Sequence, residues 1–268
     1  MQASMRAVLL GLACAAGATP VAAQGIHPVL DAKSGYVLGA PVNGTWRDGQ
    51  HVARQVGAGR RYRVFGPAGL LGTSTGTRAV SEDVPCAETF GVELSPRPEA
   101  AEAEVAVDGA WNVLPRPVTR LSAAAAAGYA GAVRQILLQH GIRSPVARVT
   151  GAARVDLDGD GTEEVIVSAF RSTGNGTFTV GAGDYSLVFV RKLVGGVVRT
   201  IMLEQEYHPR ARGETTTNEY TIAGAWDLDG NGGYEIVIRA SYYEGGWMTL
   251  YRIRGTTAQN LVSAGCGA

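Results

Sequence analysis

An acidic turn occurs twice in this chain, each time directly before an apolar stretch, and this duplication favours folds that are built from a repeated unit. Residues 154–169 read R-V-D-L-D-G-D-G-T-E-E-V-I-V-S-A, and residues 225–240 read A-W-D-L-D-G-N-G-G-Y-E-I-V-I-R-A. The first aspartates of the two turns, Asp156 and Asp227, are 71 residues apart. Self-similarity at a fixed spacing indicates one supersecondary unit built twice. Short apolar runs rich in Val and Ile are typical of strands, so we expect about four strands in each copy.

The rest of the chain is predicted to be β-rich, with one central helix. Glycine accounts for 37 of the 268 residues, about twice the usual share, as expected for short strands joined by tight turns. Five alanines follow Ser122, a suitable N-cap, and apolar residues recur at helical spacing up to Gly141, where a helix can end. The predicted parts of this mainly β chain are a signal peptide (1–23), an N-terminal β-rich region (24–120), a helix and linker (121–146) and two four-stranded repeats (147–268).

The first residues are typical of a cleavable export signal. Arg6 precedes the largely apolar stretch 7–18, and Val21-Ala22-Ala23 offers the small residues that a signal peptidase recognises. The apolar stretch is shorter than the roughly 20 residues that a membrane helix needs. We therefore expect cleavage after Ala23, export to the periplasm or the extracellular space, and no integral membrane segment in the mature protein.

The charge balance limits the classes of binding partner that we expect, and the cysteines indicate a disulfide. Removal of the signal would leave 23 basic residues against 24 acidic ones, because Arg6 is lost, and hence a formal charge of −1. This balance argues against nucleic acid and anionic membrane surfaces as partners. Cys86 and Cys266 remain after cleavage. In an oxidising compartment they most simply form a disulfide, and the alternative is two separate thiols.

Alternate positions of each acidic turn carry oxygen-bearing side chains. In a tight loop such side chains can point at one centre, and the glycines permit the positive φ angles that this needs. With a backbone carbonyl at the seventh position, the oxygen ligands suit Ca²⁺ better than Mg²⁺ or a transition metal. Without a cation the carboxylates would repel one another. We predict about two calcium ions, the alternative being two acidic β-turns. The predicted ligands are Asp156, Asp158, Asp160, Thr162 and Glu164 in the first loop, and Asp227, Asp229, Asn231, Gly233 and Glu235 in the second.

The loops differ from EF-hands, which need a Glu at the twelfth position, where this chain has Val167 and Ile238. The segments D-L-D-G-D-G-T-E-E-V-I-V and D-L-D-G-N-G-G-Y-E-I-V-I instead resemble the calcium loops of FG-GAP and VCBS repeats, over roughly residues 147–264. In that superfamily, which includes integrin α-chain propellers and many secreted bacterial proteins, the loop links strands of a propeller blade. The resemblance implies two blade-like repeats in which the predicted ligands bind calcium.

Beyond calcium binding, we predict a structural or partner-binding role without enzymatic activity, the partner being an unknown protein or glycan. A second hypothesis is a carbohydrate-binding or adhesion module. Tyr242, Tyr243 and Trp247 flank a two-glycine turn, although such aromatics are also common core pairs. A third is a secreted hydrolase, because G-T-S-T-G around Ser74 matches a nucleophile-elbow pattern. That elbow needs a following helix, and the sequence predicts a glycine-rich loop there.

Overall fold

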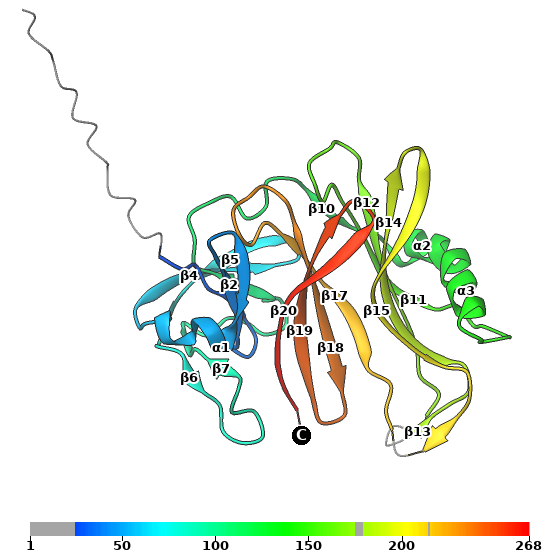
Figure 1. The fold of residues 1–268 in the computed structure, drawn as a ribbon, viewed down its shortest axis with the longest axis horizontal. Coiled ribbons are helices and arrows are strands. Elements are labelled where there is room, and N and C mark those ends of the chain that lie inside the picture. Colours follow the sequence, from blue (N-terminus) through cyan, green and yellow to red (C-terminus); the bar gives the residue numbers. More distant parts are fainter. Residues whose placement is uncertain (1–24, 175–178, 214, 268) are drawn as a thin grey trace, which may run out of the picture.

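The computed structural model describes residues 25–174, 179–213 and 215–267, which form a mainly β protein (Figure 1). Three larger antiparallel sheets follow one another across the molecule, and a helical segment covers the last of them (Figure 1). The predicted signal peptide, residues 1–23, lies outside the described residues. Within the described part of the chain, every helix is too short or too polar to cross a membrane.

The N-terminal sheet has seven strands in the order β3-β2-β1-β9-β4-β5-β8. Its central pairing joins β1 to β9, which are distant in the sequence, through the register Val29↔Val107. The sheet encloses Leu30, Tyr62 and other apolar side chains together with Val52 of α1. Its elements are β1 (Val29–Asp31), β2 (Val37–Val42), β3 (Thr45–Asp48), β4 (Arg60–Gly66), β5 (Gly69–Gly76), β8 (Leu94–Ser95) and β9 (Val105–Val107), with α1 (Gly49–Val52), the 3-10 turn η1 (Ala53–Gln55), and the separate pair β6 (Val80–Ser81) and β7 (Phe90–Gly91).

The two acidic turns lie in two further sheets, here called the outer sheet and the middle sheet. The outer sheet has the order β10-β11-β12-β14-β15, and the middle sheet has the order β17-β18-β19-β20. The outer strands are β10 (Val118–Arg120), β11 (Val149–Val155), β12 (Glu164–Arg171), β14 (Asp184–Val194) and β15 (Val197–His208), beside the small pair β13 (Thr179–Val180) and β16 (Arg212–Gly213). The middle strands are β17 (Glu219–Trp226), β18 (Glu235–Tyr242), β19 (Gly245–Arg254) and β20 (Thr257–Gly267).

The middle sheet is buried on both faces. One face packs against the N-terminal sheet through Trp226, Val237 and Leu250. The other face packs against the outer sheet through Ile236 and Ile238. Strands that are covered on both sides read as continuous apolar runs rather than as alternations, and this explains the sequence I-V-I in β18. Each acidic turn is therefore anchored by strands that lie in the core.

The predicted central helix is divided into two short helices. They are α2 (Ala123–Ala126) and α3 (Ala130–Gln139), separated by the 3-10 turn η2 (Ala127–Tyr129). The predicted ends are confirmed: Ser122 Oγ accepts from Ala125 N at 3.3 Å, and Gly141 has φ +85°. The break falls at Gly128, a residue type that disfavours helix interiors. The segment packs on the outer sheet through Val133 and Leu137.

Candidate functional site

The two acidic turns occupy equivalent places in their sheets. The first joins β11 to β12 and the second joins β17 to β18, and in both cases the loop connects neighbouring antiparallel strands. Each turn gathers three carboxylates, with one oxygen per residue lying within 4.8 Å of the others. The two groups are Asp156, Asp158 and Glu164, and Asp227, Asp229 and Glu235.

The first aspartate of each turn orders the backbone that follows it. Asp156 Oδ1 accepts from Gly159 N at 2.7 Å, and Asp156 Oδ2 accepts from Gly161 N at 3.1 Å. Asp227 makes the same contacts with Gly230 N at 2.8 Å and Gly232 N at 3.0 Å. These four glycines all have positive φ, between 75° and 87°, a conformation that other residues adopt at a cost. The turn is thus encoded by its aspartate and glycines together.

The glutamate at the ninth position closes each turn from the following strand. Glu164 Oε2 accepts from Leu157 N at 2.9 Å, and Glu235 Oε2 accepts from Leu228 N at 2.8 Å. The two glutamates are 1% and 0% exposed. A buried carboxylate is costly unless it is hydrogen-bonded and balanced by positive charge, so a cation beside each glutamate would stabilise its charged form.

In the first turn that charge comes from Lys192 on β14. Its Nζ donates to Asp158 Oδ2 at 2.8 Å and to Glu164 Oε1 at 2.6 Å. The register Val165↔Arg191 places Lys192 opposite Glu164 in the sheet. Burial alone lowers the pKa of Lys192, but its hydrogen bonds to the two carboxylates outweigh that effect and raise the pKa above its usual value. The lysine is therefore a charged, buried partner of the turn.

In the second turn Arg252 on β19 has the same place. Its Nε donates to Glu235 Oε1 at 2.8 Å, and its Nη2 donates to Glu235 Oε1 and Asp229 Oδ2. Burial raises the pKa of Glu235 to about 7, and Asp229 adds to this rise while Arg252 opposes it. Burial also raises the pKa of Asp227. Negative charge in this cluster thus remains costly despite the guanidinium.

The predicted ligands at the fifth and seventh positions behave differently from the three carboxylates. Asp160 lies outside the first carboxylate group, and its Oδ1 accepts from Thr162 N at 2.7 Å. Asn231 Oδ1 accepts from Gly233 N at 2.7 Å in the same way. Both side chains lie toward solvent. The structure therefore brings together three predicted ligands per turn and leaves the fifth-position side chains at the rim.

The two turns contact each other and one shared segment, residues 108–117 between β9 and β10, here called the β9–β10 linker. Tyr234 N, in the second turn, donates to Leu157 O, in the first, at 2.9 Å. From the linker, Trp111 Nε1 donates to Asp227 O at 2.8 Å, and Arg116 Nε donates to Asp156 O at 2.7 Å. The Arg116 guanidinium also lies 4.7 Å from the centre of the Tyr234 ring. One segment thus braces both turns.

The donor set fits a hard divalent cation. The clustered groups are carboxylates only, which Ca²⁺ and Mg²⁺ prefer over the nitrogen and sulfur ligands of zinc sites. In each turn one oxygen at the third position and one at the ninth are hydrogen-bonded to the basic side chain. The three clustered carboxylates of each turn could hold a metal ion.

The other predicted residues lie elsewhere. Cys86 and Cys266 lie at disulfide distance, with Cα atoms 5.5 Å apart. Ser74 is a buried residue within β5, where its hydroxyl donates to Pro96 O at 2.7 Å. It lies in a strand paired with β4 rather than on a strand-to-helix turn, so the elbow geometry is not formed.

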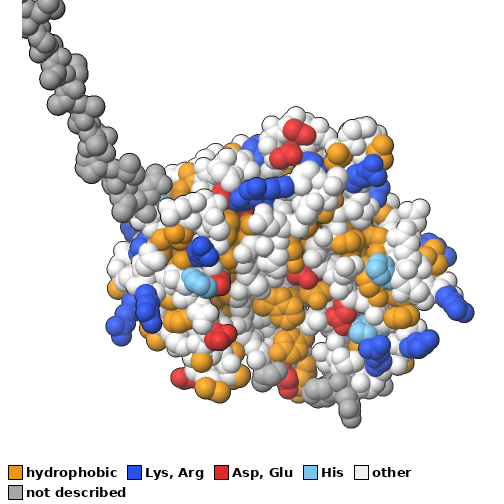
Figure 2. All heavy atoms as spheres, in the orientation of Figure 1, with side chains coloured by type: hydrophobic (Ala, Val, Ile, Leu, Met, Phe, Trp, Pro, Cys, Tyr) orange, Lys and Arg blue, Asp and Glu red, His pale blue; other side chains and the backbone are white. Residues whose placement is uncertain are grey.

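Two of the three aromatic residues of the predicted carbohydrate-binding hairpin, Tyr242 and Trp247, line a groove. Trp247 packs edge-on to Tyr220 at 6.4 Å and beside Tyr242 at 6.2 Å between ring centres, whereas Tyr243 is 59% exposed. Trp247 and Tyr242 line a hollow of about 420 Å³ that also includes Asp48 and Glu88. Figure 2 shows hydrophobic side chains gathered over the middle sheet, between the N-terminal part and the outer sheet.

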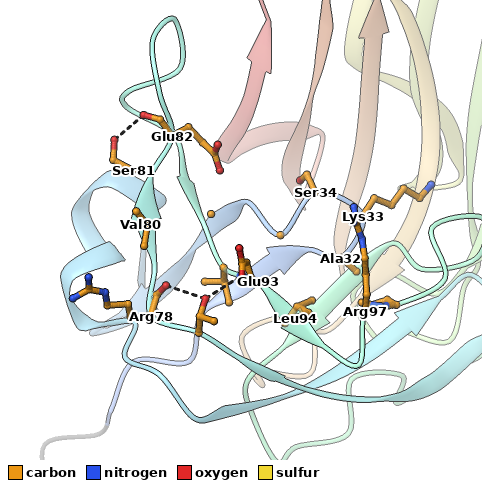
Figure 3. A pocket seen from close by; sticks show the side chains of 15 residues that line it. Ala32, Lys33, Ser34, Arg78, Val80, Ser81, Glu82, Glu93, Leu94 and Arg97 are labelled. Atoms are coloured by element: carbon orange, nitrogen blue, oxygen red, sulfur yellow. Dashed lines mark hydrogen bonds between the residues drawn. The ribbon is translucent and has the colours of Figure 1, made fainter.

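A larger hollow, of about 710 Å³, lies on the N-terminal part of the chain. Figure 3 shows charged side chains of both signs around it, among them Lys33, Arg78 and Glu93. Lys33 Nζ is engaged by Glu104 Oε1 at 2.8 Å. The residues that line this hollow include none of the sequence-predicted ligands, so the acidic turns remain the candidate site.

Comparison with known proteins yields no relatives: no protein-family model matches the chain, and neither the curated proteins nor the solved structures contain a match. The fold and the two turns therefore have to be interpreted from their own chemistry.

Sequence reasoning did not identify Lys192, Arg252, Arg116 or Trp111 as part of the site. A partial signal for the two cations exists, because each lies in a largely apolar strand segment, L-V-F-V-R-K-L-V or L-Y-R-I-R, beside one further basic residue, Arg191 or Arg254. Identifying their partners requires the strand register, which pairs residues far apart in the sequence. The contacts of the β9–β10 linker likewise depend on how the sheets stack.

Proposed function

We propose that this is an exported calcium-binding protein with a structural or partner-binding role, in which one ion binds each acidic turn. The observation that carries the proposal is the same three-carboxylate cluster formed twice, at equivalent loops of two sheets. In the first turn Asp156, Asp158, Asp160 and Glu164 would supply side-chain oxygens and Thr162 a carbonyl. In the second turn the corresponding groups are Asp227, Asp229, Asn231, Gly233 and Glu235.

Calcium in these turns would act mainly on stability. The turns contact each other and the β9–β10 linker, so an ion that orders one turn also fixes the packing of the middle and outer sheets. An ion that binds only the folded chain contributes about 2.7 kcal/mol when its free concentration is a hundredfold above the dissociation constant. Extracellular calcium sites commonly have dissociation constants of roughly 10⁻⁴–10⁻³ M, which suits an exported protein. We further propose that each repeat is a blade-like unit of the FG-GAP and VCBS type.

We expect millimolar Ca²⁺, about one to ten times such a dissociation constant, to raise the melting temperature above that in EDTA by about 1–5 °C per site, and Mg²⁺ to do so less. Asp160→Ala should reduce this calcium-dependent rise while changing the EDTA value little, because Asp160 is exposed and lies outside the carboxylate group that Lys192 contacts. Thermal unfolding followed by circular dichroism provides the measurement.

The matched control is Glu163→Ala, which removes an exposed acid from the same turn at a position that is not a predicted ligand. If both variants lower the calcium-dependent rise equally, diffuse charge attraction explains the response and the coordination proposed for the first turn is wrong.

A second candidate function is glycan binding in the groove of Tyr242 and Trp247. The observation in its favour is the hollow of about 420 Å³, in which these aromatic residues lie with the polar side chains of Asp48 and Glu88. Sugars bind where aromatic faces and hydrogen-bonding groups converge.

This candidate predicts that a glycan array identifies a ligand whose affinity falls about tenfold or more in Trp247→Ala. Tyr243→Ala, an exposed aromatic outside the lining of the hollow, serves as the control. A broad array without any ligand would remove the candidate, since Trp247 would then serve only to pack against Tyr220.

A further inference from the structure

The most informative contacts that the proposed function leaves unexplained are those of Lys192 and Arg252. Each residue lies on the strand that pairs with the strand after its turn, β14 beside β12 or β19 beside β18, opposite the ninth-position glutamate. Each donates to the same two carboxylates of its turn, at the third and the ninth position. A lysine in the first turn and an arginine in the second thus make equivalent contacts, although the two turns are distant in the sequence.

These contacts use the oxygens that a metal ion would need. Lys192 Nζ lies 2.8 Å from Asp158 Oδ2 and 2.6 Å from Glu164 Oε1. Calcium would bind such oxygens at about 2.3–2.6 Å. An ammonium group and a divalent ion that approach the same carboxylates also repel each other, by about 4 kcal/mol per pair of unit charges at 4 Å in a partly buried setting. Metal and basic side chain therefore compete.

We propose that Lys192 and Arg252 are tethered cations: each offsets part of the charge of its turn when metal is absent, and each must withdraw before a divalent ion binds. This inference rests on the proposed function, and it makes these two residues determinants of metal affinity. Without calcium the tethered cation offsets part of the negative charge of its turn, and calcium binding is weakened by the work of displacing it. As the calcium concentration rises, calcium then displaces the Lys192 or Arg252 side chain from the carboxylates.

The two turns should differ in affinity. Arg252 makes three hydrogen bonds to its carboxylates, through Nε and Nη2, whereas Lys192 makes two through one flexible ammonium group. A planar guanidinium that engages its partner at several points is harder to withdraw. The second turn also has Asn231 in place of the aspartate at the fifth position of the first. Calcium should therefore enter the first turn at the lower concentration.

The test compares Lys192→Met and Arg252→Met with wild type in two measurements, unfolding in EDTA and calcium titration by calorimetry. Each variant should melt about 5 °C or more lower in EDTA, because a buried glutamate has lost its cation. Each should also bind calcium about tenfold or more tightly at the affected turn, because the competitor is gone. The controls are Arg191→Met, the neighbouring charge on β14, and Arg254→Met, an exposed charge on β19; neither should change the affinity.

The outcomes separate this inference from the proposed function. Calcium binding by Lys192→Met but not by wild type would refute calcium binding as the native function and support the tethered cation. Lower stability in EDTA without any gain in calcium affinity would overturn the inference, since the side chains would then be ordinary ion pairs. Should Lys192→Met not fold in EDTA, Lys192→Gln keeps a hydrogen-bond donor without the charge, and the same gain in affinity is required of it.

Discussion

Replacing Arg239 by Met should destabilise the protein by about 3–5 kcal/mol, the cost of removing one partner from a buried ion pair. The Arg239 guanidinium, on β18, donates to Asp31 Oδ1 at 2.9 Å and to Glu104 Oε2 at 3.1 Å. Both acids belong to the N-terminal part and are only 6% and 9% exposed. The substitution would leave two acids at this contact, where Lys33 still pairs with Glu104 at 2.8 Å. The free energy of unfolding in urea is the quantity to measure.

Arg254→Met, at the exposed end of β19, is the control for this substitution, and exposed charges typically contribute less than about 1 kcal/mol. If Arg239→Met costs no more than this control, the ion pairs between the N-terminal and middle sheets are dispensable. The apolar contacts of Trp226, Val237 and Leu250 would then suffice to hold the two sheets together.

Removal of the Cys86–Cys266 bond should have an effect of similar size. The two residues are 180 positions apart, and closing a loop of this length stabilises a chain by about 5 kcal/mol if the effect is purely entropic. The bond ties the end of β20 to the segment that carries Cys86, where Thr89 Oγ1 also donates to Gly265 O at 2.6 Å. Cys86→Ser combined with Cys266→Ser should therefore lower the urea midpoint strongly.

Dithiothreitol gives an internal control for the disulfide. The reductant should lower the midpoint of the wild type to near that of the double variant, and it should leave the double variant unchanged. Equal midpoints for oxidised wild type, reduced wild type and the double variant would mean that the bond adds no stability, and that the contacts of β20 with β19 and the N-terminal sheet are sufficient.

The mainly β class and the strands beside the acidic turns were predictable from local sequence. The run E-V-I-V after the first turn and E-I-V-I after the second begin β12 and β18 at the glutamate in both cases. The turn itself was readable because its aspartate and glycines form it through contacts within a few residues. Local chemistry that acts at short range leaves a clear pattern in the sequence.

Features that depend on packing between distant segments were not predictable. The N-terminal sheet pairs β1 with β9 through Val29↔Val107, and no local pattern encodes that choice. Helical periodicity from Ser122 to Gly141 predicted one helix. The segment instead breaks at η2, which contains Gly128, a residue type that destabilises a helix interior. The ligand set was predicted as if each turn stood alone, so the cations that reach it from β14 and β19 were missed.

Calcium-dependent unfolding of the wild-type chain tests the central claim most directly. The melting temperature should rise from EDTA to millimolar Ca²⁺ with a midpoint near 10⁻⁴–10⁻³ M, and equal Mg²⁺ should give a smaller rise. An identical melting temperature in EDTA and in millimolar calcium would contradict calcium binding. Lys192 and Arg252 would then be the permanent cations of the two turns, whose carboxylates would serve the fold alone.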